Sequence, residues 1–323
     1  MTVRRLKWAL GMALAACAVQ LAPAHWLARV LCAPLQRWLA ALSAGVPFPL
    51  AEPLCLCLGL AGAAALARAL LRPAGGRLAA LGRYASGLAV FLAFLLLSYA
   101  LLWAPLARAQ VPPSPEAGPQ RYRALAQSLA AQAQALWTDD FPDAAQTAAQ
   151  AARLLLEETG RLPTIKAARY PEVLKALNLA GLCFPWTGEA IFRGDLSGLS
   201  LPFVAAHEGA HQLGYGSESQ ASYVAYRACL RQKGAMAYSA TAYMLYYALE
   251  TLGGWDQAAK LEILESLSPK VRADVAAIAA SQSTPGPLAG AAQVFAQATG
   301  MRDNGYGQVV AYLMADFAAA ETG

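Results

Sequence analysis

Three long apolar stretches in the first third of the chain constrain its fold more than any other feature. They run from Trp8 to Ala24, from Phe48 to Leu71 and from Ser86 to Leu106. A segment crosses a bilayer only if its backbone amides are satisfied internally, and a helix of about 20 apolar residues meets that condition. We therefore predict three transmembrane helices, at residues 8–24, 48–71 and 86–106, within a membrane anchor that covers residues 1–106.

The polar residues around these stretches refine the prediction. Arg4, Arg5 and Lys7 precede the first stretch, as they would in a cleaved signal peptide, but the two later stretches favour a retained anchor. Residues 26–43 contain too many polar interruptions to span, so we expect an amphipathic helix that lies in the membrane interface. Such an anchor makes the lipid bilayer the first predicted partner of the chain.

The positions of the arginines predict how the anchor is oriented. Arg68, Arg72, Arg77 and Arg83 lie between the second and third stretches, and loops rich in Lys and Arg stay in the cytoplasm. With the N-terminus also inside, every residue after Leu106 emerges on the outer side. We therefore predict a multi-pass protein of the inner (cytoplasmic) membrane, with the second part of the chain extracytoplasmic, in the periplasm.

The positive charge of the protein belongs to this anchor. The net charge is +5, yet residues 1–104 contain nine Lys and Arg residues against a single acid, Glu52. The remainder of the chain is net negative and has no basic patch of the kind that binds phosphate backbones. We therefore expect no nucleic acid among the partners.

The rest of the chain is predicted to be mainly α-helical. Residues 107–120 include Pro112-Pro113-Ser114-Pro115, which predicts a stiff linker before a domain of residues 121–323. Alanine- and leucine-rich patterns, interrupted by glycine or proline, predict the helices of this domain. They are expected at residues 121–137, 143–159, 171–179, 200–213, 217–233, 239–252, 256–267, 269–281, 288–299 and 306–320.

One segment of this domain favours strands over helices. Residues 184–193 place aromatic and β-branched side chains between turn-forming residues, which predicts one or two short strands. Gly188, Glu189 and Ala190 are candidates for an edge with which an extended substrate peptide pairs. The alternative is an ordinary small hairpin that caps the core. The predicted fold class is thus mainly α with a small β element.

Two of the six cysteines fall outside the anchor. Cys183 and Cys229 are able to pair in an oxidising compartment, and the sequence alone does not decide whether they meet. Cys55-Leu56-Cys57 lies in an apolar stretch and has the wrong spacing for a zinc knuckle or a thioredoxin-type pair. We interpret that pair as small buried residues.

The chemistry of the second part centres on the run His207-Glu208-Gly209-Ala210-His211. The chain has only three histidines, so a chance occurrence of this spacing is rare, at roughly 0.001 per chain. Positions i and i+4 share one face of a helix, so the imidazoles of His207 and His211 point the same way and can bind one Zn²⁺. The alternative is a pair of buried structural histidines without a metal.

Local signals set the bounds of the helix that carries this run. Ser200 is the expected N-cap and Pro202 suits the first turn. Gly214 and Gly216 then end the helix and turn the chain sharply. The motif helix is therefore predicted over residues 200–213.

A third zinc ligand is expected just after this turn. No further histidine lies outside the anchor, and Glu218 begins the next helix at a point that can return to the two imidazoles. Ser222, one turn later, is placed to donate a hydrogen bond to a ligand. The alternative is that Ser217 and Gln220 form a capping box, with Glu218 there only because an acid suits the first turn.

Glu208 is predicted to be the general base rather than a ligand. It would take a proton from zinc-bound water and pass it to the leaving amine. The developing oxyanion commonly requires a donor besides the metal. The candidates for that donor are Tyr238, Tyr243, Tyr246 and Arg227, although tyrosines at helical spacing are more often core residues.

These residues belong to a wider pattern. The run from Phe184 to Ala190, Leu201-Pro202-Phe203 and the stretch from His207 to Tyr215 resemble one uncharacterised bacterial membrane family with a domain-of-unknown-function label. That family is regarded as a set of zinc peptidases with three N-terminal spans. The resemblance covers most of the chain and implies a zinc ion and the inner membrane of a bacterium. Softer matches lie at Val46-Pro47-Phe48-Pro49, Tyr238-Ser239 and Gly305-Tyr306-Gly307.

A broader resemblance is to gluzincin-like peptidases, in which the two histidines are followed by Glu-x-x-x-Asp or Glu-x-x-x-Asn. Glu218 matches the zinc ligand of that pattern. Gln220 stands where relatives have a second acid. Ser222 replaces the Asp or Asn, which removes a group that would orient a ligand.

We therefore predict a membrane-anchored, zinc-dependent metallopeptidase with one Zn²⁺. It would hydrolyse peptide bonds of a protein or peptide substrate near the outer face of the inner membrane. The alternative is a membrane protein that keeps the fold and the metal but only binds or assembles partners. A site within the bilayer is a third interpretation, but the apolar stretch from Leu199 to Ala206 is too short to span.

Overall fold

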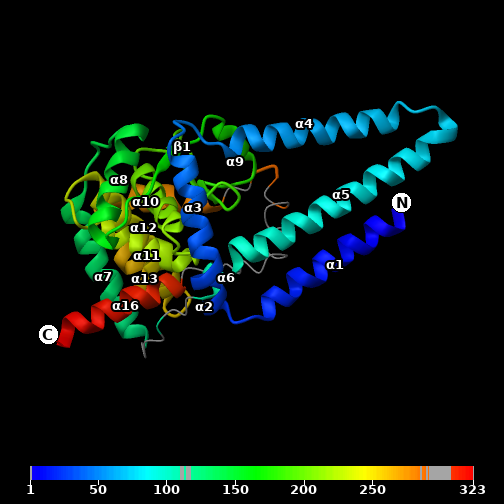
Figure 1. Cartoon of the computed structure of the whole chain (residues 1–323). Helices are drawn as coiled ribbons and strands as arrows, with labels where there is room; N and C mark the ends of the chain where they lie inside the picture. The colour runs from blue at the N-terminus through cyan, green and yellow to red at the C-terminus, as the bar shows by residue number, and fades with distance from the viewer. Residues whose placement is uncertain are drawn as a thin grey trace.

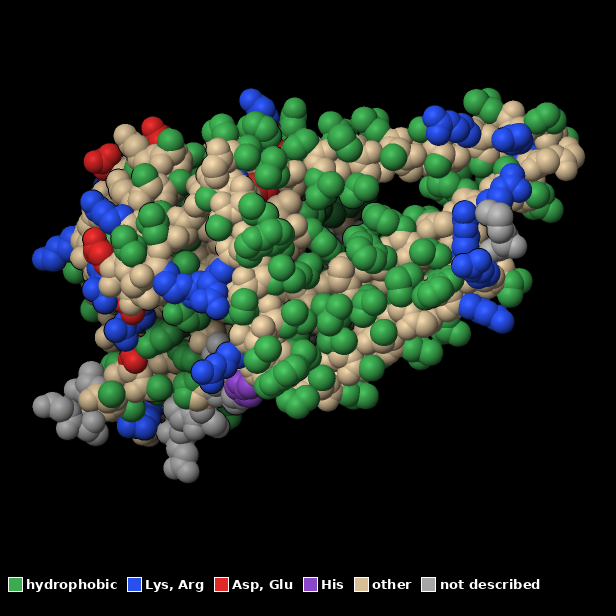
Figure 2. Space-filling model, in the orientation of Figure 1, with side chains coloured by type: hydrophobic (Ala, Val, Ile, Leu, Met, Phe, Trp, Pro, Cys, Tyr) green, Lys and Arg blue, Asp and Glu red, His purple; other side chains and the backbone are tan. Residues whose placement is uncertain are grey.

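The computed structural model describes residues 2–109, 113, 118–283, 286–288, 290 and 307–322. It is mainly helical, and Figure 1 shows two parts. Three long helices extend side by side from a body of shorter helices, with the N-terminus at their far end. Apolar side chains cover the long helices, whereas charges of both signs lie over the body (Figure 2).

The long helices are α1 (Thr2–Leu21), α4 (Ala51–Leu70) and α5 (Ala74–Leu102), with α5 packed against the other two. Both α4 and α5 are long and apolar enough to cross a membrane. The first helix qualifies only together with the following helical segment, across a bend of 105°. The described part of the chain thus has two, or up to three, candidate spans. The helix predicted at residues 86–106 is α5, which begins at Ala74 rather than Ser86. Arginines shorten an apolar run in the sequence without ending a helix.

A bent arm follows the first long helix. It consists of α2 (Ala24–Leu27), a π-helical turn η1 (Ala28–Cys32) and α3 (Ala33–Ala44). One face is buried at Cys32 and Gln36, and Gln36 Nε2 donates to the carbonyl of Pro185 at 2.8 Å. Trp26 and Trp38 are exposed on the arm. The arm is therefore packed on the body, and its predicted position in the membrane interface stays a prediction.

The body is organised around α12, most of whose residues are buried. Its helices match the predicted ones to within a few residues because local caps define them. In α8, for example, Asp143 and Gln146 form a capping box and Gly160 ends the helix at φ 72°. The helix expected at residues 288–299 lies almost entirely outside the described residues. The observed helices are α7 (Pro119–Leu136), α8 (Ala144–Thr159), α9 (Pro171–Ala176), α10 (Leu201–Gln212), α11 (Glu218–Cys229), α12 (Ala235–Gly253), α13 (Gln257–Ser266), α14 (Pro269–Ser283) and α16 (Gly307–Thr322).

A small mixed sheet lies between the body and the long helices. Its strands are β1 (Ile165–Ala167), β2 (Gly181–Phe184) and β3 (Glu189–Phe192), in the order β1-β3-β2. The third strand pairs with β1 in parallel and with β2 antiparallel. The expected substrate edge at Gly188, Glu189 and Ala190 is therefore wrong, because both sides of this strand are already paired. Sequence reasoning also missed β1, which is too short to show an alternating pattern.

A buried ion pair joins the sheet to the long helices. Lys166 Nζ lies 2.6 Å from Glu189 Oε1, and the two side chains are 7% and 0% exposed. The Glu189 carboxylate also accepts the N–H groups of Leu50 and Ala51, at 2.8 and 2.9 Å, where α4 begins. The lysine donates in addition to the carbonyl of Ser43 at 2.8 Å. The body and the start of α4 thus share one hydrogen-bond network.

The chain is closely packed around the boundary expected between anchor and domain. A short helix, α6 (Ala104–Arg108), runs across that boundary, and its first three residues are buried. A Cβ placed on Gly216 would lie 2.5 Å from the carbonyl carbon of Leu106, so α6 packs directly on the body. Of the predicted linker, residues 110–112 and 114–117 lie outside the described residues.

The two cysteines beyond the anchor are both free thiols. Cys229 lies in the main core, whereas Cys183 packs in a separate cluster with Tyr99 and Trp103 of the long-helix region. Cys183 and Cys229 therefore form no disulfide in this structure, because a disulfide requires the two Cα atoms to be close.

Candidate metal centre

The motif helix α10 is held in the centre of the body, with nearly all of its residues buried. Ser200 is not an effective N-cap, since its hydroxyl contacts that of Ser197 at 3.1 Å instead of capping the backbone. At the other end the N–H of Tyr215 donates to the carbonyl of Ala210 at 3.2 Å. This turn requires Gly214 at φ 99°, where a side chain would be strained. The reversal brings the start of α11 back over α10.

Three predicted ligands converge at this reversal. His207 Nε2 lies 3.1 Å from Glu218 Oε2, and His211 Nε2 lies 3.4 Å from Glu218 Oε1. One donor atom from each residue falls within 4.8 Å of the others. Ligand atoms about 2 Å from a tetrahedral zinc ion are about 3.3 Å apart, so this spacing fits one ion. The donor set of two imidazoles and a carboxylate also suits Zn²⁺.

The outer nitrogens of both imidazoles are hydrogen-bonded. His211 Nδ1 lies 2.8 Å from the carbonyl of Tyr215, to which it must donate, so the neutral ring keeps a lone pair on Nε2. His207 Nδ1 lies 3.1 Å from the hydroxyl of Ser222, the residue predicted to support a ligand. Partners of this kind fix the tautomer and ring orientation of metal-binding histidines. Both Nε2 atoms are thereby directed to the same point.

The charges of the cluster are strongly coupled. Burial lowers the pKa of His207. At His211 burial acts in the same direction, but the Glu218 carboxylate outweighs it and raises the pKa to about 9. At Glu218 the desolvation of the carboxylate is in turn outweighed by His211 and His207 together, which hold its pKa well below the usual range. The metal-free cluster therefore holds a proton that an incoming cation would displace.

Glu208 lies beside the cluster without joining it. Its side chain is buried, and burial raises its pKa to about 8. A Cβ placed on Gly181, the first residue of β2, would lie 2.5 Å from Glu208 Oε1. The carboxylate thus fills the space between the motif helix and β2, the outer strand of the sheet. Gly181 is a site residue that the sequence analysis missed, because its role depends on a contact 27 positions away.

The end of a long helix forms another wall of the site. The ring of Trp103, directly after α5, meets the ring of His211 edge-on with centroids 5.6 Å apart. Phe203 contacts His207 from within the body, with centroids 6.0 Å apart. No sequence pattern pointed to Trp103, since a tryptophan at the end of a span is ordinarily explained by the membrane interface.

The four expected oxyanion donors have other partners. The hydroxyl of Tyr238 donates to Asp274, and Arg227 contacts Asp316 at 3.2 Å and Glu158 at 3.8 Å. The donor role of Tyr238 and of Arg227 stays a prediction, and in the structure both side chains are bonded to carboxylates. Tyr243 stacks on Phe203, and Tyr246 packs against Tyr247.

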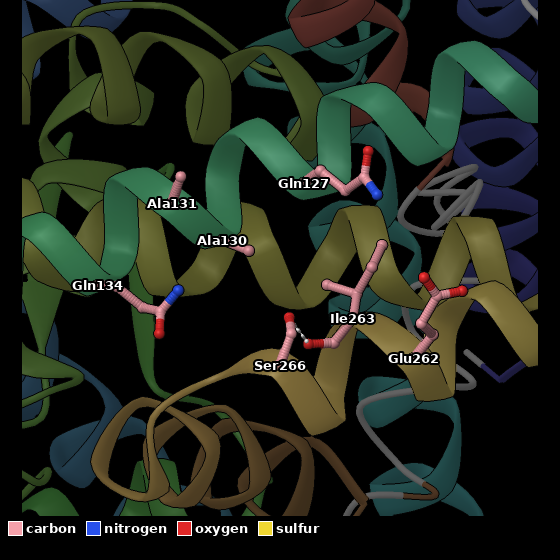
Figure 3. A pocket seen from close by; sticks show the side chains of 7 residues that line it. All are labelled: Gln127, Ala130, Ala131, Gln134, Glu262, Ile263 and Ser266. Carbon is pink, nitrogen blue, oxygen red and sulfur yellow. Dashed lines mark hydrogen bonds between the residues drawn. The ribbon is translucent and has the colours of Figure 1, made fainter.

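A surface groove elsewhere on the body contains none of the site residues. It lies between α7 and α13, where Gln127, Gln134 and Glu262 flank it (Figure 3). At its floor the hydroxyl of Ser266 donates to the carbonyl of Ile263 at 2.7 Å. The groove offers no cluster of ligands or nucleophiles, so the metal centre remains the candidate site.

Comparison with known proteins places the chain in a family. A family model described as a protein of unknown function (DUF3810) matches residues 28–314, from η1 to within α16. The matched region includes the three-ligand cluster, Glu208 and Trp103. The curated proteins and the solved structures contain no match. The chain belongs to the DUF3810 family.

Proposed function

We propose that this protein is a membrane-anchored zinc metallopeptidase with a zincin-like catalytic domain. The observation that carries the proposal is the convergence of His207, His211 and Glu218, with donor atoms within 4.8 Å of one another beside a buried, non-ligating Glu208. Catalytic zinc sites use three such ligands and leave one position open. The side chain of Glu218 is 60% exposed, which supports access from solvent.

The chain's own residues suit the two proton transfers of peptide hydrolysis. Zn²⁺, when bound, would polarise the scissile carbonyl and favour ionisation of water. Glu208 would accept the proton of the attacking water and return it to the leaving amine. Its raised pKa suits a group that must both gain and lose a proton near neutral pH. Ser222 and the carbonyl of Tyr215 would keep the imidazoles oriented throughout.

The outer strand β2 is the proposed binding edge for the substrate. Within the described residues, no third strand pairs with its other side. Gly181 places this strand against Glu208, so a peptide added along it would pass the general base. Backbone pairing of this kind requires little of the substrate sequence.

The contact between Trp103 and the candidate metal centre supports cleavage of a peptide bond close to the bilayer. Trp103 follows a candidate span directly and contacts His211, so the metal centre lies next to the end of α5. We therefore propose that the substrate is a protein or peptide held near the membrane. By the arginine positions, this is the outer face of a bacterial inner membrane.

A comparison of zinc binding and cleavage tests the proposal. The full chain in detergent is expected to bind one equivalent of zinc and to cleave members of a random quenched-fluorescent peptide library. Glu208→Gln should keep its zinc and lose cleavage, whereas His211→Ala should lose both. Zinc binding that survives in Glu218→Ala would remove that residue from the site. A parent protein without cleavage of any peptide would overturn the enzyme proposal.

A second candidate function is metal binding without hydrolysis. It is favoured by one observation, namely that two of the predicted oxyanion donors, Tyr238 and Arg227, are bonded to Asp274 and Asp316. If this second function is correct, the parent protein and Glu208→Gln should each bind one equivalent of zinc, and neither should cleave a peptide. The same assay therefore separates the two functions.

An alkaline-phosphatase fusion tests the proposed side of the membrane. A fusion after residue 120 should be active, since the enzyme folds only outside the cytoplasm. An inactive fusion beside an active control fused to a secreted protein would place the metal centre in the cytoplasm.

A further inference from the structure

The end of the long helices farthest from the body carries a hollow lined by arginines. Arg5 of α1, Arg68 at the end of α4, Arg72 just after it and Arg83 of α5 border this hollow, with Tyr84 beside them. We call these four arginines the arginine hollow. Figure 2 shows blue side chains gathered at this end, beyond the apolar flanks of the helices.

The arginine hollow has no acidic partner among the described residues. The only acid of residues 1–104 is Glu52, which lies at the opposite end of α4 and accepts the N–H groups of Arg169 and Tyr170. Arg5 Nη1 donates to the carbonyl of Arg83 at 3.1 Å, which fixes one guanidinium beside another helix. Each guanidinium has five N–H donors, so one hydrogen bond uses only a small part of the donor capacity.

Four like charges around one hollow repel one another. An anion in the hollow would offset this repulsion and accept charge-assisted hydrogen bonds from several guanidinium groups. Basic residues that only set the orientation of the helices must lie on the cytoplasmic side of the membrane. They need not converge on one hollow from three helices, as these arginines do.

The surroundings identify the class of anion. Leu71 and Leu78 are each 83% exposed near this end, and Leu70 is 48% exposed. Exposed apolar side chains beside arginines fit the boundary between acyl chains and headgroups, where a small soluble anion would gain nothing from the leucines. A ligand with both a phosphate and acyl chains uses the arginines and the leucines together.

We propose that the arginine hollow binds the headgroup phosphate of an anionic phospholipid. The guanidinium groups hold the phosphate oxygens, and the neighbouring leucines contact the acyl chains. The site is about the length of α4 away from the metal centre, or ~30 Å for 20 residues at 1.5 Å each. It is therefore independent of the proposed peptidase function.

Lipid binding to the intact protein tests this proposal. The full chain in detergent is titrated with phosphatidylglycerol, cardiolipin or phosphatidylcholine and analysed by native mass spectrometry. The two anionic lipids are expected to bind at least tenfold more tightly than phosphatidylcholine. The variant Arg68→Gln/Arg72→Gln/Arg83→Gln should lose that preference. The matched control Arg29→Gln/Arg37→Gln, with the arginines of the bent arm, should keep it.

Each other outcome overturns the proposal. Equal binding of phosphatidylcholine by the parent protein excludes anionic recognition, and this arm does not depend on whether the triple variant folds. A preference that the triple variant retains places lipid binding elsewhere. Displacement of phosphatidylglycerol by an equal concentration of inorganic phosphate would identify a free-phosphate site instead.

Discussion

The substitution Gly181→Ala provides a direct test of the position of Glu208. The new Cβ would lie 2.5 Å from Cγ and Oε1 of Glu208, whereas ordinary contacts of a Cβ begin at 3.4 Å. The carboxylate must therefore move by about 1 Å, a displacement that costs on the order of 100-fold in rate when a catalytic group is misplaced. We expect kcat/KM for peptide cleavage to fall by about that factor.

The same geometry predicts that the fold and the metal survive. The nearest atoms all belong to the side chain of Glu208, not to the backbone or to a ligand. Zinc content, measured by mass spectrometry, should stay at one equivalent. Gly194→Ala is the matched control, because its Cβ meets Ala144 at an ordinary 3.4 Å, and its activity should stay within about twofold of the parent.

A double-mutant cycle decides how Gly181→Ala acts. If it acts through the general base, adding it to Glu208→Gln should cause no further loss of activity. Additive losses would mean that the methyl group disturbs a substrate paired with β2 instead. Full activity in a folded, zinc-loaded Gly181→Ala variant would refute the role assigned to the Glu208 carboxylate.

Three further predictions concern the metal and the buried ion pair. Zinc affinity should rise about tenfold per pH unit between pH 7 and 8.5 in chelator competition, because zinc must displace the proton held by His211, whose pKa is raised to about 9; a flat profile would contradict this. Ser222→Ala should weaken zinc binding by about 10- to 100-fold, because it removes the hydroxyl that contacts His207 Nδ1. Ser222→Thr, which keeps a hydroxyl, should restore zinc binding in part. Lys166→Met leaves a buried carboxylate unpaired and should lower the free energy of unfolding in detergent by about 3–5 kcal/mol. Glu262→Gln, which removes an exposed ion pair with Arg123, is the control and should cost about 1 kcal/mol or less. Equal losses of unfolding free energy in the two variants would refute the stabilising role of the buried Lys166–Glu189 pair.

The sequence predicted the local parts of the site well. The spacing of His207 and His211 specifies one face of a helix, and the glycine turn after them specifies a reversal that returns Glu218. Ser222 follows from the same reasoning, since it lies one turn further along α11. Each of these relations spans at most 15 residues, so periodicity and turn chemistry are enough to infer it.

The sequence predicted the non-local parts poorly. Tyr238 and Arg227 were plausible donors by residue type, but their partners Asp274 and Asp316 lie 36 and 89 positions away. The edge strand was assigned to the wrong half of the hairpin because β1 was missed, and one extra strand converts an edge into a centre. Hydrophobic patterns indicate which segments are strands, but they do not order the strands in a sheet.

The packing of the predicted anchor against the rest of the chain bears on the proposed function. A flexible tether would let a catalytic domain sample substrates at many distances from the membrane. Here Trp103 contacts His211, α6 packs against Gly216, and Glu189 binds the first amides of α4. Three separate contacts fix the metal centre to the ends of two candidate spans. Under the proposed function, packing would set the distance from the bilayer to Glu208, and a peptide would have to be presented close to the membrane to reach it.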